Sequence, residues 1–283
     1  ESKPFYFTVQ REEVQETSVP FYGMITPEIG CIKLKIFNEG AGKDVQTAFD
    51  SLKKATPNMK GLVLDLRGNP GGLMNEAVNI VNVFIDKNKL VVTTKGKVDE
   101  WNNTFKTLNE PSDTKIPLVI ITNSMSASAS EIVSGTMQDY DRAVIIGQRT
   151  YGKGLVQVTK PLSYNTMLKV TTAKYYIPTG RCIQALLYTE KNADGSVKRV
   201  PDSLKVAFKT LNSGRTVYDG GGIDPDVKLD KPEHSRIAET LYTKNYIFDF
   251  ASAYTLTHNS IGDPATFKLT DKDFEDFVAY VKT

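Results

Sequence analysis

Apolar residues follow two patterns through the middle of the chain. Nearly continuous apolar runs, as at 61–66 and 117–122, are typical of strands buried on both faces. Other stretches carry apolar residues three and four positions apart, as on one buried face of a helix. Together the patterns predict, in chain order, strand 30–37, helix 43–56, strand 61–66, helix 73–85, strands 90–94 and 117–122, helix 128–139 and strand 143–147. This alternation predicts an α/β core with helices against a largely parallel sheet.

The flanks of this core follow other patterns. Phe5, Phe7 and Val9 alternate with their neighbours as in a strand, so residues 1–23 are predicted to be an extended segment. Later in the core we expect two strands over 155–177 with a turn at 163–165, and then a loop-rich stretch. Helical patterns over 233–253 and 271–282 end the chain. The predicted organisation is the segment 1–23, the core 24–230 and a C-terminal helical segment 231–283 packed on the core.

Charge and composition exclude several classes of protein. The net charge is +2, from 35 basic and 33 acidic residues, which argues against nucleic acid as the main partner. No apolar run reaches the length of about 18 residues that spans a bilayer. Cys31 and Cys182 cannot form a structural zinc site alone, and a disulfide between them is not indicated. The chain begins at Glu1 rather than Met, so we expect either a processed end or the boundary of an excised fragment. The compartment stays open.

A glycine-rich turn follows the buried strand at 61–66. In Asp65-Leu66-Arg67-Gly68-Asn69-Pro70-Gly71-Gly72, the strand ends in a tight bend that leads into a helix. Glycines allow close backbone approach, and a helix N-terminus offers unpaired N–H groups, so the turn could stabilise a developing oxyanion. The alternative is an ordinary turn. A dinucleotide site is not indicated, because the Gly-x-Gly-x-x-Gly spacing is missing.

A serine-rich junction follows the strand at 117–122. In Ser126-Ala127-Ser128-Ala129-Ser130, the chain passes from a buried strand into a helix. This junction lies at the carboxyl edge of the sheet, where α/β proteins bind their ligands. Its arrangement is similar to a nucleophile elbow, although the Gly-x-Ser-x-Gly pattern is absent. The alternative is that Ser126 or Ser128 only caps the helix.

A nucleophilic serine needs a base. His234 and His258 both come after the predicted core and are better explained as surface residues, so a Ser-His-Asp triad is not favoured. Lys153 lies between Gly152 and Gly154 at the start of an apolar strand. A lysine can act as a base when burial favours its neutral form. Gln157, four residues later on the same predicted strand face, could orient the amine without adding charge. The alternative is a surface lysine in a hairpin.

Taken together, these segments resemble the carboxy-terminal (tail-specific) processing protease family. The similarity extends over nearly the whole chain, and Lys153 follows Ser128 by 25 residues, as in the family. The resemblance implies Ser128 as nucleophile, Lys153 as general base, Gln157 as the residue that positions the lysine, and the N–H groups of Gly72 and Ala129 as oxyanion hole. It also implies peptide hydrolysis through an acyl-enzyme without metal or cofactor.

The family resemblance carries further expectations. The fold would be a crotonase-like or Clp-protease-like α/β core with a mixed sheet, accessory β elements and C-terminal helices. Substrates would be proteins recognised near an apolar C-terminus, in the bacterial periplasm or envelope. The stretch 245–251 looks like the Bacteroidetes branch. Family members usually carry a PDZ domain before this core, and residues 1–23 look like the strand that follows it. Oligomeric state and regulatory partners are left open.

Two other functions compete with the peptidase interpretation. A crotonase-like enzyme acting on acyl thioesters would share the α/β core and the oxyanion hole, but the Ser128 and Lys153 pair speaks against it. The other possibility is a peptide-binding or scaffold domain that has the same fold but does not cleave the peptide. Labelling of Ser128 by a serine-directed probe would count against this last possibility, because the labelling reaction requires an activated nucleophile.

Overall fold

The computed structural model describes residues 6–12, 16–231, 233, 235–263 and 266–282. The chain divides into two compact units, Glu1–Asp230 and Lys231–Thr283. Among the described residues, no helix is long and apolar enough to cross a membrane.

A six-stranded mixed sheet forms the base of the first unit. Its strand order is β1-β2-β3-β6-β7-β14, with β1 antiparallel to β2 and the remaining neighbours parallel. The strands are β1 Phe21–Thr26, β2 Ile29–Lys33, β3 Gly61–Asp65, β6 Leu118–Thr122, β7 Val144–Gly147 and β14 Val227–Lys228. Both predicted apolar runs lie in this sheet as neighbours, since Leu64 pairs with Ile120 and both are fully buried. The mixed α/β core expected from the sequence is confirmed.

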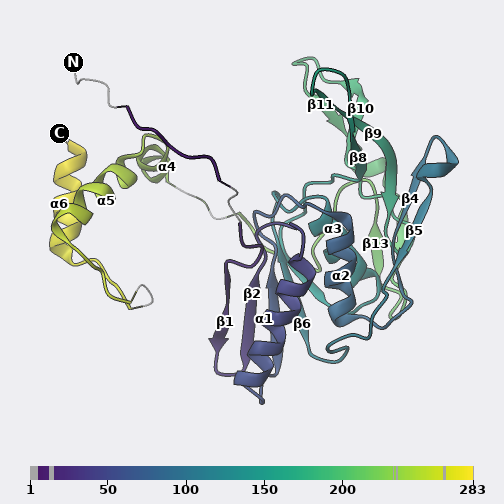
Figure 1. The fold of residues 1–283 in the computed structure, drawn as a ribbon, viewed down its shortest axis with the longest axis horizontal. Coiled ribbons are helices and arrows are strands. Elements are labelled where there is room, and N and C mark those ends of the chain that lie inside the picture. Colours follow the sequence, from purple (N-terminus) through teal and green to yellow (C-terminus); the bar gives the residue numbers. More distant parts are fainter. Residues whose placement is uncertain (1–5, 13–15, 232, 234, 264–265, 283) are drawn as a thin grey trace. The chain divides into compact units, whose positions relative to one another are not determined.

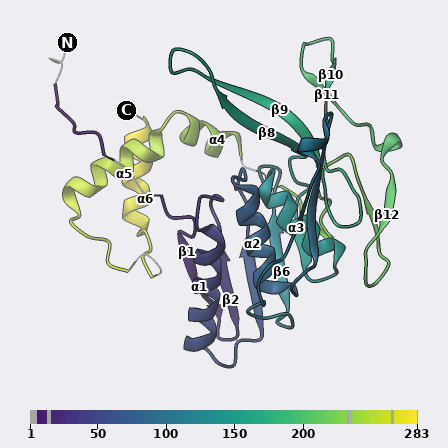
Figure 2. The same ribbon diagram turned by 45° about the vertical axis from the view of Figure 1, so that its right-hand side comes forward.

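Three helices lie in a row against this sheet, as Figure 1 and Figure 2 show. They are α1 Ala41–Ala55, α2 Met74–Phe84 and α3 Ala129–Asp139. Helix α1 contacts α2, and α2 contacts α3. Phe49 of α1 and Phe84 of α2 are buried and pack edge to face, with ring centroids 5.3 Å apart. Helix α3 is buried along its whole length, because a second sheet lies on its other side.

The second sheet has four antiparallel strands in the order β5-β4-β9-β8. They are β4 Leu90–Gly96, β5 Asn103–Lys106, β8 Leu155–Pro161 and β9 Met167–Tyr176. Strand β4 contacts α2 and α3, so these helices lie between the two sheets. Strands β8 and β9 continue beyond the body of the unit as a hairpin, which Figure 1 shows as a projecting arm. We call residues 155–176 the β8–β9 hairpin.

Shorter elements complete the chain. Strands β10 Leu186–Lys191 and β11 Val197–Arg199 form one pair, and β12 Ala207–Lys209 and β13 Thr216–Tyr218 form another. Two 3-10 turns lie at Asp99–Trp101 and Asp202–Leu204. The second unit contains helices α4 Arg236–Thr243, α5 Tyr246–Thr257 and α6 Asp271–Lys282. The accessory β elements and C-terminal helices expected from the resemblance are present.

Two expectations about local structure need correction. The predicted helix 233–253 is two helices, because Asn245 adopts a left-handed conformation (φ 60°) between α4 and α5. Residues 6–12 form no strand, although their apolar residues alternate, since they pair with no strand in the described part of the chain. Phe5 lies outside the described residues. That residues 1–23 follow a PDZ domain and that 231–283 pack on the core stay predictions.

Candidate active site

Ser128 lies at a strained junction between β6 and α3. Its backbone has φ 57° and ψ −114°, a region that costs a non-glycine residue of order 1–3 kcal/mol. The Ser128 N–H donates to Glu131 Oε2 at 2.8 Å, which helps to hold this conformation. The bend places the Ser128 side chain on the wall of a pocket of about 350 Å³. Such a turn is the backbone feature expected of a nucleophile elbow.

The three serines of this segment have different environments. The Ser126 hydroxyl donates to the carbonyl of Leu66 at 2.8 Å, and the Ser130 hydroxyl donates to the carbonyl of Asn69 at 3.0 Å. Both side chains are fully buried, and neither residue lines the pocket. Ser128 is half-buried and does line it. Ser126 and Ser130 therefore tie the helix start to the glycine turn, and Ser128 is left facing the pocket.

Asn69 holds the glycine turn against the serine segment. Its buried side chain donates to the carbonyl of Leu34 at 2.9 Å and accepts from the Gly71 N–H at 2.9 Å. Its own carbonyl accepts from the Ala127 N–H at 3.0 Å. Gly71 has φ 99°, and a Cβ there would lie 2.8 Å from Ser128 Cβ. Only glycine fits this position, because the turn passes so close to the serine.

Two backbone N–H groups at the pocket are unpaired. Gly72 and Ala129 line the pocket, and within the described part of the chain neither N–H donates a hydrogen bond. The groups on either side of Gly72 are engaged, since Phe37 donates to Gly71 and accepts from Leu73. Ala129 is the first residue of α3, so its N–H also benefits from the positive end of the helix dipole. Unpaired donors beside a serine can stabilise an anionic oxygen.

Lys153 reaches the same pocket from a glycine-flanked turn. Its N–H donates to Glu131 Oε2 at 2.9 Å, and its carbonyl accepts from the Tyr175 hydroxyl. Burial raises the pKa of Tyr175 well above its usual range, so this hydroxyl keeps its proton and remains a donor. Gly152 has φ 87°, and a Cβ there would lie 2.3 Å from Ala185 Cβ. The backbone of Lys153 is thus fixed on both sides, while its half-buried side chain lines the pocket.

Gln157 also lines the pocket. The sequence argument that placed it on the same strand face as Lys153 is wrong, however. Strand β8 begins at Leu155, so Lys153 precedes it and strand alternation does not relate the two side chains. Gln157 is exposed, and its carboxamide makes no hydrogen bond among the described residues. Its role in positioning Lys153 stays a prediction.

Glu131 is the residue that the sequence analysis missed. Its carboxylate is fully buried and receives the N–H groups of Ser128, Gly152 and Lys153, and Thr150 Oγ1 lies 2.5 Å from its Oε1. Burial raises the pKa of this carboxyl, although the four donors oppose the shift. One side chain therefore connects the turn that carries Ser128 to the turn that carries Lys153. The spacing Ser128-x-x-Glu131 is that of a capping box and could have drawn attention to it.

Comparisons with known proteins agree with this arrangement. The family model of peptidase family S41 matches residues 28–192, more than half of the chain. The chain belongs to peptidase family S41. A second family model, the C-terminal helical domain of a probable PDZ-protease, matches residues 237–283. The resemblance inferred from the serine, lysine and glycine segments is confirmed at the level of the family.

Relatives of this S41 protein include processing proteases. A carboxy-terminal-processing protease of Bartonella bacilliformis is 38% identical over 186 residues, which are 65% of this chain and 42% of that protein. A probable CtpA-like serine protease of Staphylococcus aureus is 32% identical over 240 residues, 84% of this chain and 40% of that protein. The chain therefore spans less than half the length of these curated relatives.

Solved structures show the same fold. The photosystem II D1 C-terminal processing protease superposes with a TM-score of 0.56 at 27% identity, covering 77% of this chain and 50% of that chain. A putative S41 protease from Bacteroides fragilis has a TM-score of 0.56 at 15% identity, with 86% and 60% covered. At that identity the second comparison shows the fold alone.

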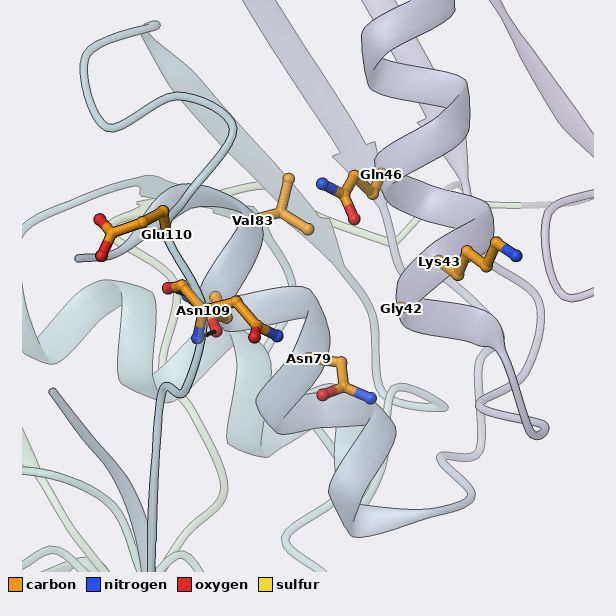
Figure 3. Close-up of a pocket in the computed structure, with 8 residues that line it drawn as sticks. Gly42, Lys43, Gln46, Asn79, Val83, Asn109 and Glu110 are labelled. Carbon is orange, nitrogen blue, oxygen red and sulfur yellow. Dashed lines mark hydrogen bonds between the residues drawn. The ribbon is translucent and has the colours of Figure 1, made fainter. Parts of the chain in front are cut away.

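A second pocket in this S41 protein has different chemistry. It measures about 210 Å³ and lies between α1, α2 and the loop at 109–110 (Figure 3). Polar side chains line it, including Gln46, Asn79 and Glu110, but it contains neither a serine nor Lys153. Elsewhere, His258 is an exposed residue stacked on Tyr254, and His234 lies outside the described residues. The pocket at Ser128 is therefore the candidate active site. In the described ranges, no cluster of metal-binding side chains occurs.

Proposed function

We propose that this S41 protein hydrolyses peptide bonds with Ser128 as nucleophile and Lys153 as general base. The observation that carries the proposal is that Ser128, Lys153 and the unpaired N–H groups of Gly72 and Ala129 line one pocket. The names of the relatives, a carboxy-terminal-processing protease and a probable serine protease, support the same reaction.

The reaction proceeds in two stages. The Ser128 hydroxyl attacks the substrate carbonyl carbon, and the neutral Lys153 amine accepts its proton. The N–H groups of Gly72 and Ala129 stabilise the oxyanion of the tetrahedral intermediate. The Lys153 ammonium then gives the proton to the leaving amine, and the acyl group remains on Ser128 as an ester. Water, deprotonated by Lys153, hydrolyses this ester and restores the serine.

Substrate and location follow from the family alone. We expect protein substrates recognised near an apolar C-terminus, and action in the periplasm or cell envelope. Gln157 would orient the Lys153 amine, since both line the pocket. The reaction requires neither a metal nor a cofactor, because a neutral lysine and backbone donors supply the base and the electrophilic assistance.

The first test compares Ser128→Ala and Lys153→Ala with the unaltered chain in casein cleavage and in labelling by a fluorophosphonate. We expect cleavage to fall by at least ~10³-fold in both variants, as for loss of a nucleophile or its base. Ser124→Ala and Lys160→Ala are matched controls, because both residues are exposed and neither lines the pocket.

Three outcomes would each contradict the proposal or a part of it. Full cleavage by Lys153→Ala would exclude the lysine as base. Peptide binding with neither cleavage nor labelling would favour a domain that binds without turnover. Tight binding of an acyl thioester together with loss of peptide cleavage would favour the crotonase-like alternative.

A further inference from the structure

The far end of the β8–β9 hairpin holds large apolar side chains in solvent. We call residues 160–169 the hairpin tip. Its exposed apolar residues include Leu162, Tyr164, Met167 and Leu168, and Tyr164 is 97% exposed. Figure 2 shows the hairpin as an arm that leaves the body of the first unit, so the tip lies away from the core. These side chains therefore contribute little to the stability of that unit.

The turn of the hairpin tip contains a tyrosine at a position that favours smaller residues. The Thr166 N–H donates to the Ser163 carbonyl at 3.3 Å, and the two residues between them have positive φ, 59° at Tyr164 and 55° at Asn165. This is the geometry of a two-residue type I′ turn, which favours Asn, Asp and Gly. A bulky residue with positive φ is unusual and is a reason to look for a function. Because the Tyr164 ring lies in solvent, packing within the described chain does not account for it.

Two lysines lie directly behind this turn. Beyond Thr172, an extra residue in β9, the pairing of the two strands is regular. Lys160 of β8 pairs with Leu168, and Lys169 of β9 pairs with Thr159 on the next rung. The hairpin tip thus has one lysine on each strand, at nearly the same distance from the turn.

No acidic residue offsets these lysines in the neighbouring sequence. Between Asp141 and Glu190 every charged residue is basic, although the whole chain has nearly equal numbers of both kinds, 35 basic and 33 acidic. The hairpin itself contains Lys160, Lys169 and Lys174. It is therefore positively charged as well as apolar at its tip.

A lipid surface fits this combination better than a folded protein does. Lysines behind exposed apolar side chains can place their ammonium groups among anionic headgroups while the apolar groups enter the acyl boundary. A tyrosine ring suits that depth, because one end is apolar and the other is polar. A stable interface with a protein needs about 800 Å² and roughly 20–30 residues on each side, which is more than this narrow tip offers.

We propose that the hairpin tip docks on the surface of an anionic lipid bilayer, with Leu162, Tyr164 and Met167 at the headgroup boundary and Lys160 and Lys169 among the headgroups. The proposal goes beyond the proposed peptidase reaction and does not depend on it. A few apolar side chains and two lysines give weak, reversible binding, since stable anchoring takes stronger signals. The tip would orient the protein at a bilayer rather than anchor it there.

Docking would bring the candidate active site close to the bilayer. Strand β8 starts at Leu155, two residues after Lys153, and at about 3.3 Å per residue it reaches the turn within about 30 Å. An extended segment of about ten residues spans that distance. A polypeptide attached to the bilayer could therefore reach Ser128 through a short segment.

The test measures binding of the whole chain to vesicles by co-sedimentation. One set of vesicles is phosphatidylcholine alone, and the other is equal parts of phosphatidylcholine and phosphatidylglycerol. We expect binding to the anionic vesicles, little binding to the neutral ones, and a loss of binding as added salt screens the charges. Ser128→Ala should bind like the unaltered chain. Absence of binding to the anionic vesicles, or equal binding to both sets, would overturn the proposal.

Substitutions locate the surface that binds. Lys160→Glu should weaken binding about 5–30-fold, since each basic residue near an anionic surface contributes about a factor of five. Lys87→Glu makes the same change of net charge at an exposed lysine outside the hairpin and should bind almost normally. Tyr164→Asn should weaken binding about 3–10-fold through lost apolar burial, whereas Tyr22→Asn, at a half-exposed tyrosine of β1, should not. Equal losses within either pair would show that the tip is not the docking surface.

A tryptophan at the tip tests the contact directly. Tyr164→Trp adds a second tryptophan to Trp101, and the unaltered chain with Trp101 alone is the control. We expect the variant's emission to shift to shorter wavelength on anionic vesicles and to be quenched by brominated lipids. Vesicle binding without either change would mean that another surface contacts the lipid. If the chain instead forms dimers that the tip substitutions dissociate, the tip belongs to a second copy and the proposal is wrong.

Discussion

The stretch 126–139, which carries Ser128 and is called the serine segment here, and the β8–β9 hairpin border the same pocket. The two are built in opposite ways. Every residue from 126 to 139 is buried except Ser128, whereas every residue from 159 to 171 is exposed. Polar groups in the serine segment are bonded to fixed partners, as Ser126, Ser130 and Glu131 show. In the hairpin, large apolar residues such as Tyr164 and Met167 lie in solvent.

This difference separates two requirements of the protein. The reacting groups must be held in one geometry before substrate arrives, since preorganised donors account for much of catalysis. A surface that docks on a lipid bilayer must instead keep its charged and apolar side chains available. We therefore expect substitutions in the serine segment to affect stability and chemistry together, and substitutions in the hairpin tip to leave stability almost unchanged.

The largest effect is expected for Glu131→Gln. Glutamine has one acceptor oxygen, and its NH2 group would face N–H donors that now bond to the carboxylate, so at least one of them loses its partner. We expect the free energy of unfolding to fall by about 2–4 kcal/mol, as for unpaired buried groups. Urea unfolding followed by fluorescence measures this change. In the folded variant, fluorophosphonate labelling of Ser128 should also slow, because Glu131 fixes the backbone of both Ser128 and Lys153.

Glu76→Gln provides the control for this substitution. Glu76 is also buried, but it accepts one backbone N–H, from Gly42, and an amide oxygen can still serve that donor. Its variant should lose less stability and keep normal labelling. Equal losses for the two variants would mean that Glu131 is only a buried acid and not a link between the turns that carry Ser128 and Lys153.

Much of this arrangement was predictable because its signals are local. Apolar runs identified the buried strands, and Ser128, Lys153 and the glycine turn stood out from their own neighbours in the sequence. The same local signals could not choose among Ser126, Ser128 and Ser130 without the family resemblance, because all three precede or begin the helix. Their different hydrogen-bond partners, Leu66 and Asn69, are about sixty residues away.

The missed features depend on contacts between distant segments or on single backbone angles. Glu131 looked like an ordinary helix residue, and its partners at 150–153 become visible only when α3 and the lysine turn are brought together. The extra residue Thr172 in β9 leaves no mark on the alternation of apolar residues. The break between helices α4 and α5 at Asn245 could have been predicted from the sequence, since asparagine tolerates the left-handed conformation that ends helices.

A second, smaller effect concerns the strain at Ser128. Its φ of 57° and ψ of −114° suit glycine better than any residue with a Cβ. Ser128→Gly should therefore be more stable than Ser128→Ala by about 1–2 kcal/mol, although neither variant can be labelled by the probe. Chemical unfolding of the two variants measures the difference. Equal stabilities would show that the surrounding bonds, and not the residue type, remove the cost of this conformation.

The smallest effect is expected for two tyrosines at opposite ends of the hairpin. Tyr164 lies in the turn, 97% exposed, with φ 59°, a conformation that asparagine also accepts. Tyr164→Asn should change the free energy of unfolding by less than about 0.5 kcal/mol, as is usual for surface positions. Tyr175→Phe, at the buried end of β9, leaves the Lys153 carbonyl without its donor and should cost about 1 kcal/mol. A loss for Tyr164→Asn as large as that for Tyr175→Phe would mean that the hairpin tip is packed against another part of the protein, and that its exposed surface is not available to a lipid bilayer.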